Sequence, residues 1–160
     1  MADEVMELTP EMKAAIGKSG DKVTQEVTTL GIRTFARAVG YTNPIYYDEE
    51  AAKAKGHRAL VSPPGHFGMA VYNPGKGGGM NQGRDFPSPF TRNLDGGREV
   101  EPVERVYAGD ILESVTTLTN LEIVPSRAYG QMMIRTSETV FTRKSDGKVV
   151  GRTRSTGISY

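Results

Sequence analysis

The part of the chain after about Arg98 constrains the fold most strongly, because it consists mostly of strand-forming residues. Runs rich in Val, Ile, Thr and Leu alternate with short turn-forming segments. The runs cover 98–107, 111–124, 129–143 and 148–158. Asp146-Gly147, between the last two runs, is a tight-hairpin signature. The sequence therefore predicts an antiparallel meander of about four strands.

The first third of the chain predicts short helices. The expected elements are a helix over 10–16, a strand over 22–28, a helix from Thr28 or Thr29 to about Val39, and a helix over 49–55 capped by Asp48. Gly40 and Gly56 end the last two helices. Apolar residues follow a helical period on the longer one, at Ile32, Phe35, Ala36 and Val39. Helices first and sheet afterwards predict an α+β fold.

Gly40 to Ala52 contains a rigid corner between two helices. Proline fixes its own backbone and keeps Asn43 out of the helical region, so Asn43-Pro44 predicts a turn. Asn43 is expected to form this turn through its own side chain. Rigid corners between elements are common places for functional sites.

Residues 60–72 are small and apolar on nearly all sides and predict a buried helix. Ser62 is expected to cap this helix, with Pro63 and Pro64 in its first turn. A buried helix start leaves backbone N–H groups pointing at an anion or a polarised carbonyl. The Gly/Pro-rich stretch 73–97 predicts a long irregular loop.

Composition excludes several classes of function. A length of 160 residues fits one domain, and a formal net charge of +1 argues against nucleic-acid binding. No run is long and apolar enough to span a membrane. The absence of cysteine, with His57 and His66 as the two histidines, argues against a zinc site. The acidic start is unlike a secretory signal, so a cytoplasmic protein is expected.

Several motifs together resemble the MaoC-like dehydratases of the hot-dog fold, which include (R)-specific enoyl-CoA hydratases. The matching residues are Gly40, Asn43-Pro44-Ile45, Ala51-Ala52, Pro64-Gly65 and Val106 to Leu112. Tyr46-Tyr47-Asp48 and Ser62-Pro63-Pro64 are typical of the branch with an N-terminal dehydratase-type domain. The resemblance covers nearly all of the chain. It implies one hot-dog domain over 1–160, with an antiparallel sheet wrapped around one long buried helix.

The residues that carry the family's chemistry are replaced in this chain. The family motif is Gly-Asp-x-Asn-Pro-aliphatic-His, whose Asp and His hold a water and move its proton. Here Tyr41 stands at the Asp position and Tyr46 at the His position. A phenol has a pKa of about 10, so it is a poor base at neutral pH. The resemblance therefore implies the non-catalytic subunit of a two-subunit dehydratase, whose partner chain supplies the Asp/His dyad.

The substrate expected from this resemblance is an acyl thioester of coenzyme A or an acyl carrier, with no other cofactor and no metal. The candidate substrate-binding residues are Tyr41, Asn43, Tyr46, Pro64, Gly65, His66 and Phe67. The backbone at Pro64, Gly65 and His66 is a candidate oxyanion hole. The expected assembly is a dimer or a dimer of dimers containing the dyad-bearing MaoC-like subunit.

Two alternatives remain open from the sequence. One is a self-sufficient homodimeric hydratase in which His66, with Asp48 or Glu99, rebuilds a dyad in a new place. The other is a non-enzymatic protein that binds acyl thioesters or acts as a scaffold. Candidate phosphate contacts for coenzyme A are Lys76, Arg84, Arg92, Arg152 and Arg154. For Arg152 and Arg154, two residues apart on one strand face, a solvated face is the default.

Overall fold

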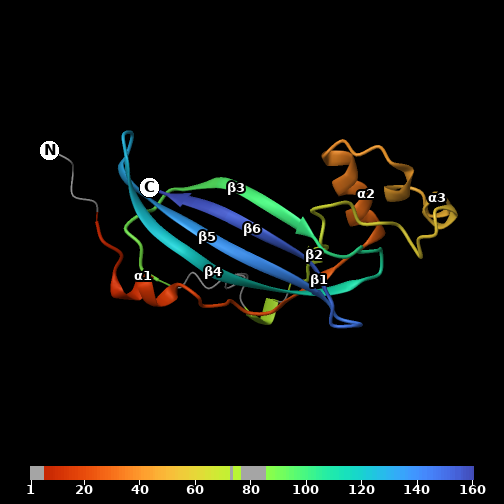
Figure 1. The fold of residues 1–160 in the computed structure, drawn as a ribbon, viewed down its shortest axis with the longest axis horizontal. Helices are drawn as coiled ribbons and strands as arrows, with labels where there is room; N and C mark the ends of the chain where they lie inside the picture. Colours follow the sequence, from red (N-terminus) through yellow and green to blue (C-terminus); the bar gives the residue numbers. More distant parts are fainter. Residues whose placement is uncertain (1–5, 73, 77–85) are drawn as a thin grey trace.

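The computed structural model describes residues 6–72, 74–76 and 86–160. Within them, six strands form one curled antiparallel sheet in the order β2-β1-β4-β5-β6-β3, with helices near its two ends (Figure 1). The strands are β1 (Val23–Glu26), β2 (Met69–Ala70), β3 (Asn93–Pro102), β4 (Ile111–Ser126), β5 (Gly130–Arg143) and β6 (Val149–Ser159). The predicted α+β class is confirmed.

The predicted meander is confirmed for β4, β5 and β6, but the first strand lies elsewhere. β3 starts at Asn93, inside the stretch predicted to be loop, and pairs with β6 instead of β4. β3 and β4 do not form a hairpin, because β5 and β6 lie between them in the sheet. The segment that connects them forms an isolated bridge from Tyr107 to Val61. β3 is therefore an edge strand of the sheet.

The short helices agree with the sequence prediction. They are α1 (Pro10–Ala15), α2 (Thr29–Ala38), the 3₁₀ turn η1 (Pro44–Tyr46) and α3 (Glu49–Ala54), with a further 3₁₀ turn, η2 (Pro74–Lys76). The Thr28 hydroxyl accepts the Gly31 N–H and caps α2, and Asp48 accepts two N–H groups at the start of α3. On α2, Ile32 and Ala36 are fully buried, whereas Val39 at the end of the apolar face is exposed.

The long buried helix predicted for residues 62–72 is wrong. Val61 forms its bridge with Tyr107, a turn follows, and β2 then pairs with β1. Gly65 and Gly68 have φ of 89° and 83°, in the left-handed region that a right-handed helix excludes. A side chain at Gly68 would also collide with the Glu26 carbonyl at 2.8 Å, so backbone packs on backbone here. No helix of the described residues lies along the sheet as the predicted one would.

Two apolar clusters lie at opposite ends of one sheet face, which we call the inner face. The first contains Val27, Ile32, Leu60, Phe67, Val106, Leu112 and Val150. The second contains Met12, Leu121 and Met133. Burial of these side chains supplies most of the hydrophobic stabilisation.

The other face of the sheet, the outer face, carries ion pairs. Arg152 lies 3.7 Å from Glu101, and Arg154 lies 3.5 Å from Glu99 and 4.0 Å from Glu138. These arginines occupy the solvated, charge-paired strand face that was the default expectation for them.

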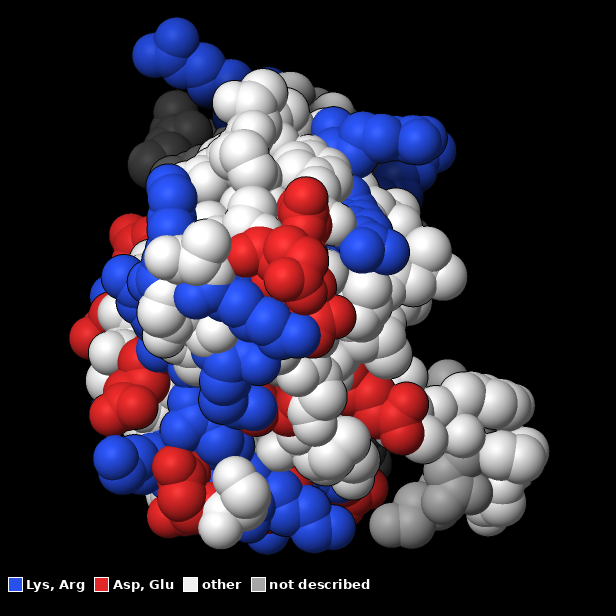
Figure 2. All heavy atoms as spheres, turned by 90° about the vertical axis from the view of Figure 1, so that its right-hand side faces the viewer, with Lys and Arg blue, Asp and Glu red and all other residues white. Residues whose placement is uncertain are grey.

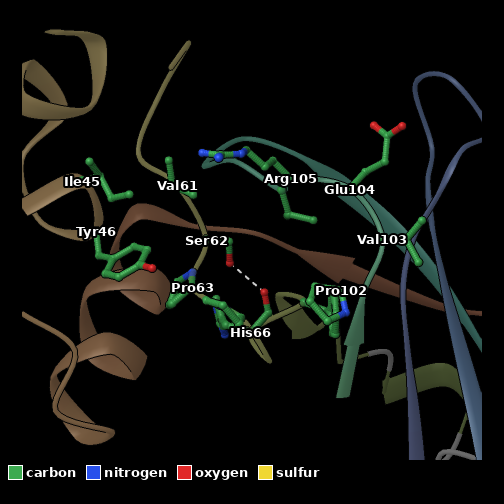
Figure 3. Close-up of a pocket in the computed structure, with 13 residues that line it drawn as sticks. Ile45, Tyr46, Val61, Ser62, Pro63, His66, Pro102, Val103, Glu104 and Arg105 are labelled. Atoms are coloured by element: carbon green, nitrogen blue, oxygen red, sulfur yellow. Dashed lines mark hydrogen bonds between the residues drawn. The ribbon is translucent and has the colours of Figure 1, made fainter. Parts of the chain in front are cut away.

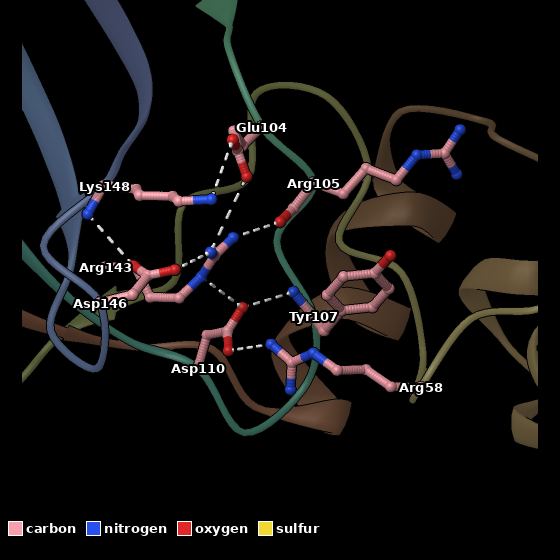
Figure 4. A network of polar contacts seen from close by, with 8 residues as sticks. All are labelled: Arg58, Glu104, Arg105, Tyr107, Asp110, Arg143, Asp146 and Lys148. Atoms are coloured by element: carbon pink, nitrogen blue, oxygen red, sulfur yellow. Dashed lines mark hydrogen bonds and ion pairs between the residues drawn. The ribbon is translucent and has the colours of Figure 1, made fainter.

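A buried carboxylate joins the end of β5 to the start of β4. Asp110 is 6% exposed and receives an ion pair from Arg58, a second from Arg143 at 3.5 Å, and the Tyr107 N–H at 2.9 Å (Figure 4). Arg143 also contacts the Arg105 carbonyl at 2.6 Å and Asp146 at 2.8 Å. This network holds the segment that follows β3 against the sheet.

Candidate functional site

The Asn-Pro corner is built as predicted. The Asn43 side chain accepts the Ile45 N–H at 3.2 Å and caps η1, which is the turn-forming role expected of it. Ile45 is buried, and Tyr46 packs half-buried beside it. Tyr41 is 39% exposed, and its ring centroid lies 5.9 Å from that of Tyr46. The two phenols at the positions predicted to be degenerate dyad positions are thus neighbours.

A cavity of about 370 Å³ opens beside this corner (Figure 3). Four of the predicted substrate-binding residues line it: Tyr46, Pro64, His66 and Phe67. The phenol of Tyr46 points toward the segment that carries Ser62 and Pro63 (Figure 3). Tyr41 and Asn43 belong to the corner but do not line the cavity. Gly65 lines an adjoining cavity on the inner face of the sheet.

The candidate oxyanion hole is a tight turn instead of a helix start. The Ser62 hydroxyl donates to the His66 carbonyl at 2.7 Å, and the His66 N–H donates to the Pro63 carbonyl at 3.1 Å. Pro64 has no N–H to offer. Of the three predicted positions, only Gly65 has a backbone N–H that no described residue accepts. A single donor replaces the predicted set.

His66 is buried against α2. Its ring stacks on Phe35 at 5.2 Å, and no described residue hydrogen-bonds its Nε2. Burial lowers the pKa of His66, because the charged imidazolium would lose hydration. Asp48 caps α3, and Glu99 pairs with Arg154 on the outer face. The structure therefore brings neither proposed carboxylate to His66.

Two charged residues that the sequence did not single out also line the cavity. Glu104 and Arg105 follow β3 and line the same cavity as Tyr46. Arg105 Nη1 also lies 3.2 Å from His57 Nε2. The signal was present, since both residues directly precede the matched Val106-to-Leu112 motif. Figure 2 shows the end of the molecule nearest α2 and α3, where positive and negative side chains are interspersed.

Comparison with known proteins identifies the family. The model of the FAS1-like, dehydratase domain region matches residues 14–152. The chain belongs to this family. A UPF0336 protein of Streptomyces griseus is 34% identical over 123 residues, which cover 73% of this chain and 79% of that protein. The matched range includes every residue of the corner and every residue that lines the cavity.

Solved structures show that this FAS1-like dehydratase domain has the hot-dog fold. A chain of the HadBC (3R-hydroxyacyl-ACP dehydratase) complex of Mycobacterium tuberculosis aligns with a TM-score of 0.67 and 23% identity, covering 90% of this chain and 96% of that one. A chain of the ChsH1-ChsH2 complex of the same organism aligns with a TM-score of 0.66 and 19% identity, covering 92% and 90%.

Two other candidate positions of this FAS1-like dehydratase domain, Lys76 and Arg92, do not line the cavity. Lys76 ends η2, the Arg92 backbone pairs with Tyr160, and Arg84 lies outside the described residues. Among the described residues, no three His, Asp or Glu side chains converge in a way that would hold a metal ion. In that same part of the chain, no helix has the length and apolarity needed to cross a bilayer.

Acidification is expected to destabilise the fold through His66. Its folded-state pKa is lowered, whereas in the unfolded chain histidine titrates near 6.5. The stability from the neutral ring is therefore complete above about pH 6.5 and is lost as the pH falls below it. Urea unfolding from pH 7.5 to 5.5 should show a steeper loss for the wild type than for His66→Gln. Equal slopes would contradict this assignment.

Proposed function

We propose that this chain is the accessory, pocket-forming subunit of a heteromeric enoyl-CoA hydratase, or 3-hydroxyacyl-thioester dehydratase. A partner MaoC-like chain supplies the Asp/His dyad. In the hydration direction, the water oxygen bonds to C3 of the enoyl thioester as the C2=C3 π bond breaks and its electron pair moves to C2. The dyad takes one proton from the water and delivers one proton to C2, so it ends the reaction in its starting protonation state. This chain contributes the corner cavity and the Gly65 N–H for the thioester carbonyl.

One observation carries the proposal: the corner presents two phenols where the chemistry needs a carboxylate and an imidazole. Tyr41 and Tyr46 stand side by side at these positions, on a backbone turn capped by Asn43. A phenol as a class is too weak an acid to supply the base that a carboxylate and an imidazole provide near neutral pH. His66, the remaining imidazole of the cavity, has no described acidic partner.

The sheet edge supports an assembly with a partner. β3 is an edge strand whose ten residues are all exposed, and β6 pairs with it on one side alone. An exposed edge of this length is a template for pairing with another chain. Both structural neighbours named above come from two-component complexes. We assign β3 as the edge toward the dyad-bearing subunit.

The test is reconstitution. The purified chain alone should show no hydration of a 2-enoyl-CoA, followed by loss of enoyl-thioester absorbance. Activity should appear on adding a hot-dog chain that keeps the intact Asp-x-Asn-Pro-x-His motif, such as one encoded next to this gene. A partner whose motif His is changed to Ala is the control, and it should bind without restoring turnover.

Two outcomes would point to other functions. Strong turnover by this chain alone, abolished by His66→Gln, would establish the self-sufficient homodimer instead. Acyl-CoA binding without turnover in any assembly would establish a binding or scaffold protein.

A further inference from the structure

The middle of the inner face is hydrophilic, although both of its ends are apolar. Two adjoining cavities of about 230 and 590 Å³ lie there, and Arg98, Thr116 and Thr139 line both. Further Ser and Thr side chains of the strands belong to the lining: Ser114, Ser137, Thr153 and Ser155. A second guanidinium, that of Arg135, lines the larger cavity alone and donates to the Asn93 side chain at 3.0 Å. Ser114 and Thr153 are each only 5% exposed, so hydroxyl groups occupy a place where a hydrocarbon chain would need apolar contacts.

Arg98 is the charged group shared by these cavities. Its Nε donates to the Ser155 hydroxyl at 3.2 Å, and no carboxylate of the described residues forms an ion pair with it. Two carboxylates also line these cavities, Asp95 in the larger and Asp21 in the smaller. The Asp95 carboxylate accepts the Gly97 N–H at 3.0 Å. By contrast, Arg154 on the adjacent strand, facing the outer side, has two glutamates within 4.0 Å.

The smaller polar cavity adjoins the corner cavity. Phe67 lines both the corner cavity and the smaller inner-face cavity, which Gly65 also lines. The smaller and larger inner-face cavities then share Arg98. A ligand whose thioester is held at Gly65 would therefore lie in the same cavity as this guanidinium.

We infer that the acyl group bound by this chain carries a carboxylate remote from the thioester, and that Arg98 holds that carboxylate. A guanidinium presents a planar fork of donors that fits a carboxylate in two parallel hydrogen bonds. The surrounding hydroxyl groups satisfy the remaining carboxylate lone pairs. The inference rests on the part of the proposed function that makes the ligand an acyl thioester. It does not depend on which chain carries the Asp/His dyad.

Calorimetric titration of the full chain tests it, with and without the partner. The probes are mono-CoA thioesters of dicarboxylic acids and methyl-terminated acyl-CoAs of the same lengths. At the best-fitting length, the carboxylated ligand should bind at least about tenfold tighter, since a hydrogen bond to a charged group is worth a factor of this order. Arg98→Gln should abolish that preference, and Arg98→Lys should retain part of it.

Arg154→Gln is the matched control, because it removes the same charge from the neighbouring strand on the outer face. It should leave the preference unchanged. The inference is overturned if no chain length shows a preference, or if Arg98→Gln and Arg154→Gln weaken both ligand types equally. This titration measures binding and is independent of the reconstitution assay, which measures turnover. A binding preference without turnover on reconstitution would refute the proposed function alone. Turnover on reconstitution without a binding preference would refute this inference alone.

Discussion

Replacing Arg143 with Met is expected to lower the free energy of unfolding by about 3 kcal/mol. Asp110 is 6% exposed and has two arginine partners, and the substitution removes Arg143, the buried one of the two. Arg58 and the Tyr107 N–H remain, which places the cost at the lower end for a broken buried ion pair. The Arg105 carbonyl also loses its donor. Urea unfolding at neutral pH measures the loss.

Lys148→Ala is the control for Arg143. Its ammonium belongs to the same network but is 60% exposed and lies 3.8 Å from Glu104, so the expected change is within about 0.5 kcal/mol. Adding Asp110→Asn to Arg143→Met should recover part of the stability by removing the unpaired charge. Equal effects of Arg143→Met and Lys148→Ala would show that the network around Asp110 contributes no buried pairing energy.

Gly151→Ala is expected to destabilise the protein by about 1–3 kcal/mol, because β6 has no room for a side chain at this position. A Cβ atom there would lie 2.3 Å from two carbon atoms of the Phe67 ring. That ring cannot move freely, since it stacks on Phe141 with centroids 4.4 Å apart. Because Phe67 lines the corner cavity, the displaced ring should also weaken acyl-thioester binding.

A double-mutant cycle isolates this contact. Phe67→Leu alone removes aromatic packing, but in the Gly151→Ala background it also relieves the overlap. The double variant should therefore lose less stability than the sum of the single variants, with a coupling of about 0.5–3 kcal/mol. Additive losses would mean that Gly151 and Phe67 do not contact each other in solution.

The corner and the short helices could be predicted from the sequence because their causes are local. Thr28, Asn43 and Asp48 each cap the element that follows within three residues, and the structure shows these bonds. Proline and glycine positions set the same turns. The prediction that Tyr41 and Tyr46 replace the family dyad also comes from the sequence, because it requires only residue identities at matched motif positions.

The cavity could be predicted only in part. Four candidate substrate-binding residues line it, Tyr46, Pro64, His66 and Phe67. Glu104 and Arg105, which were not candidates, also line it, and they lie next to the bridge between Val61 and Tyr107. No local pattern encodes a contact between segments so far apart in the chain. The position of Arg98 also depends on a contact between distant segments. The register in which β3 pairs with β6 decides which side chains of β3 face the inner side of the sheet.

The sequence by itself determined the last three strands, the caps and the rigid corner, since each depends on neighbouring residues. Only the tertiary structure decided that β3 lies at the sheet edge and that residues 62–72 form a turn and a short strand instead of a helix. The apolar pattern of that segment suited a buried helix equally well. Backbone packing against β1, which requires Gly68 without a side chain, selected the extended form.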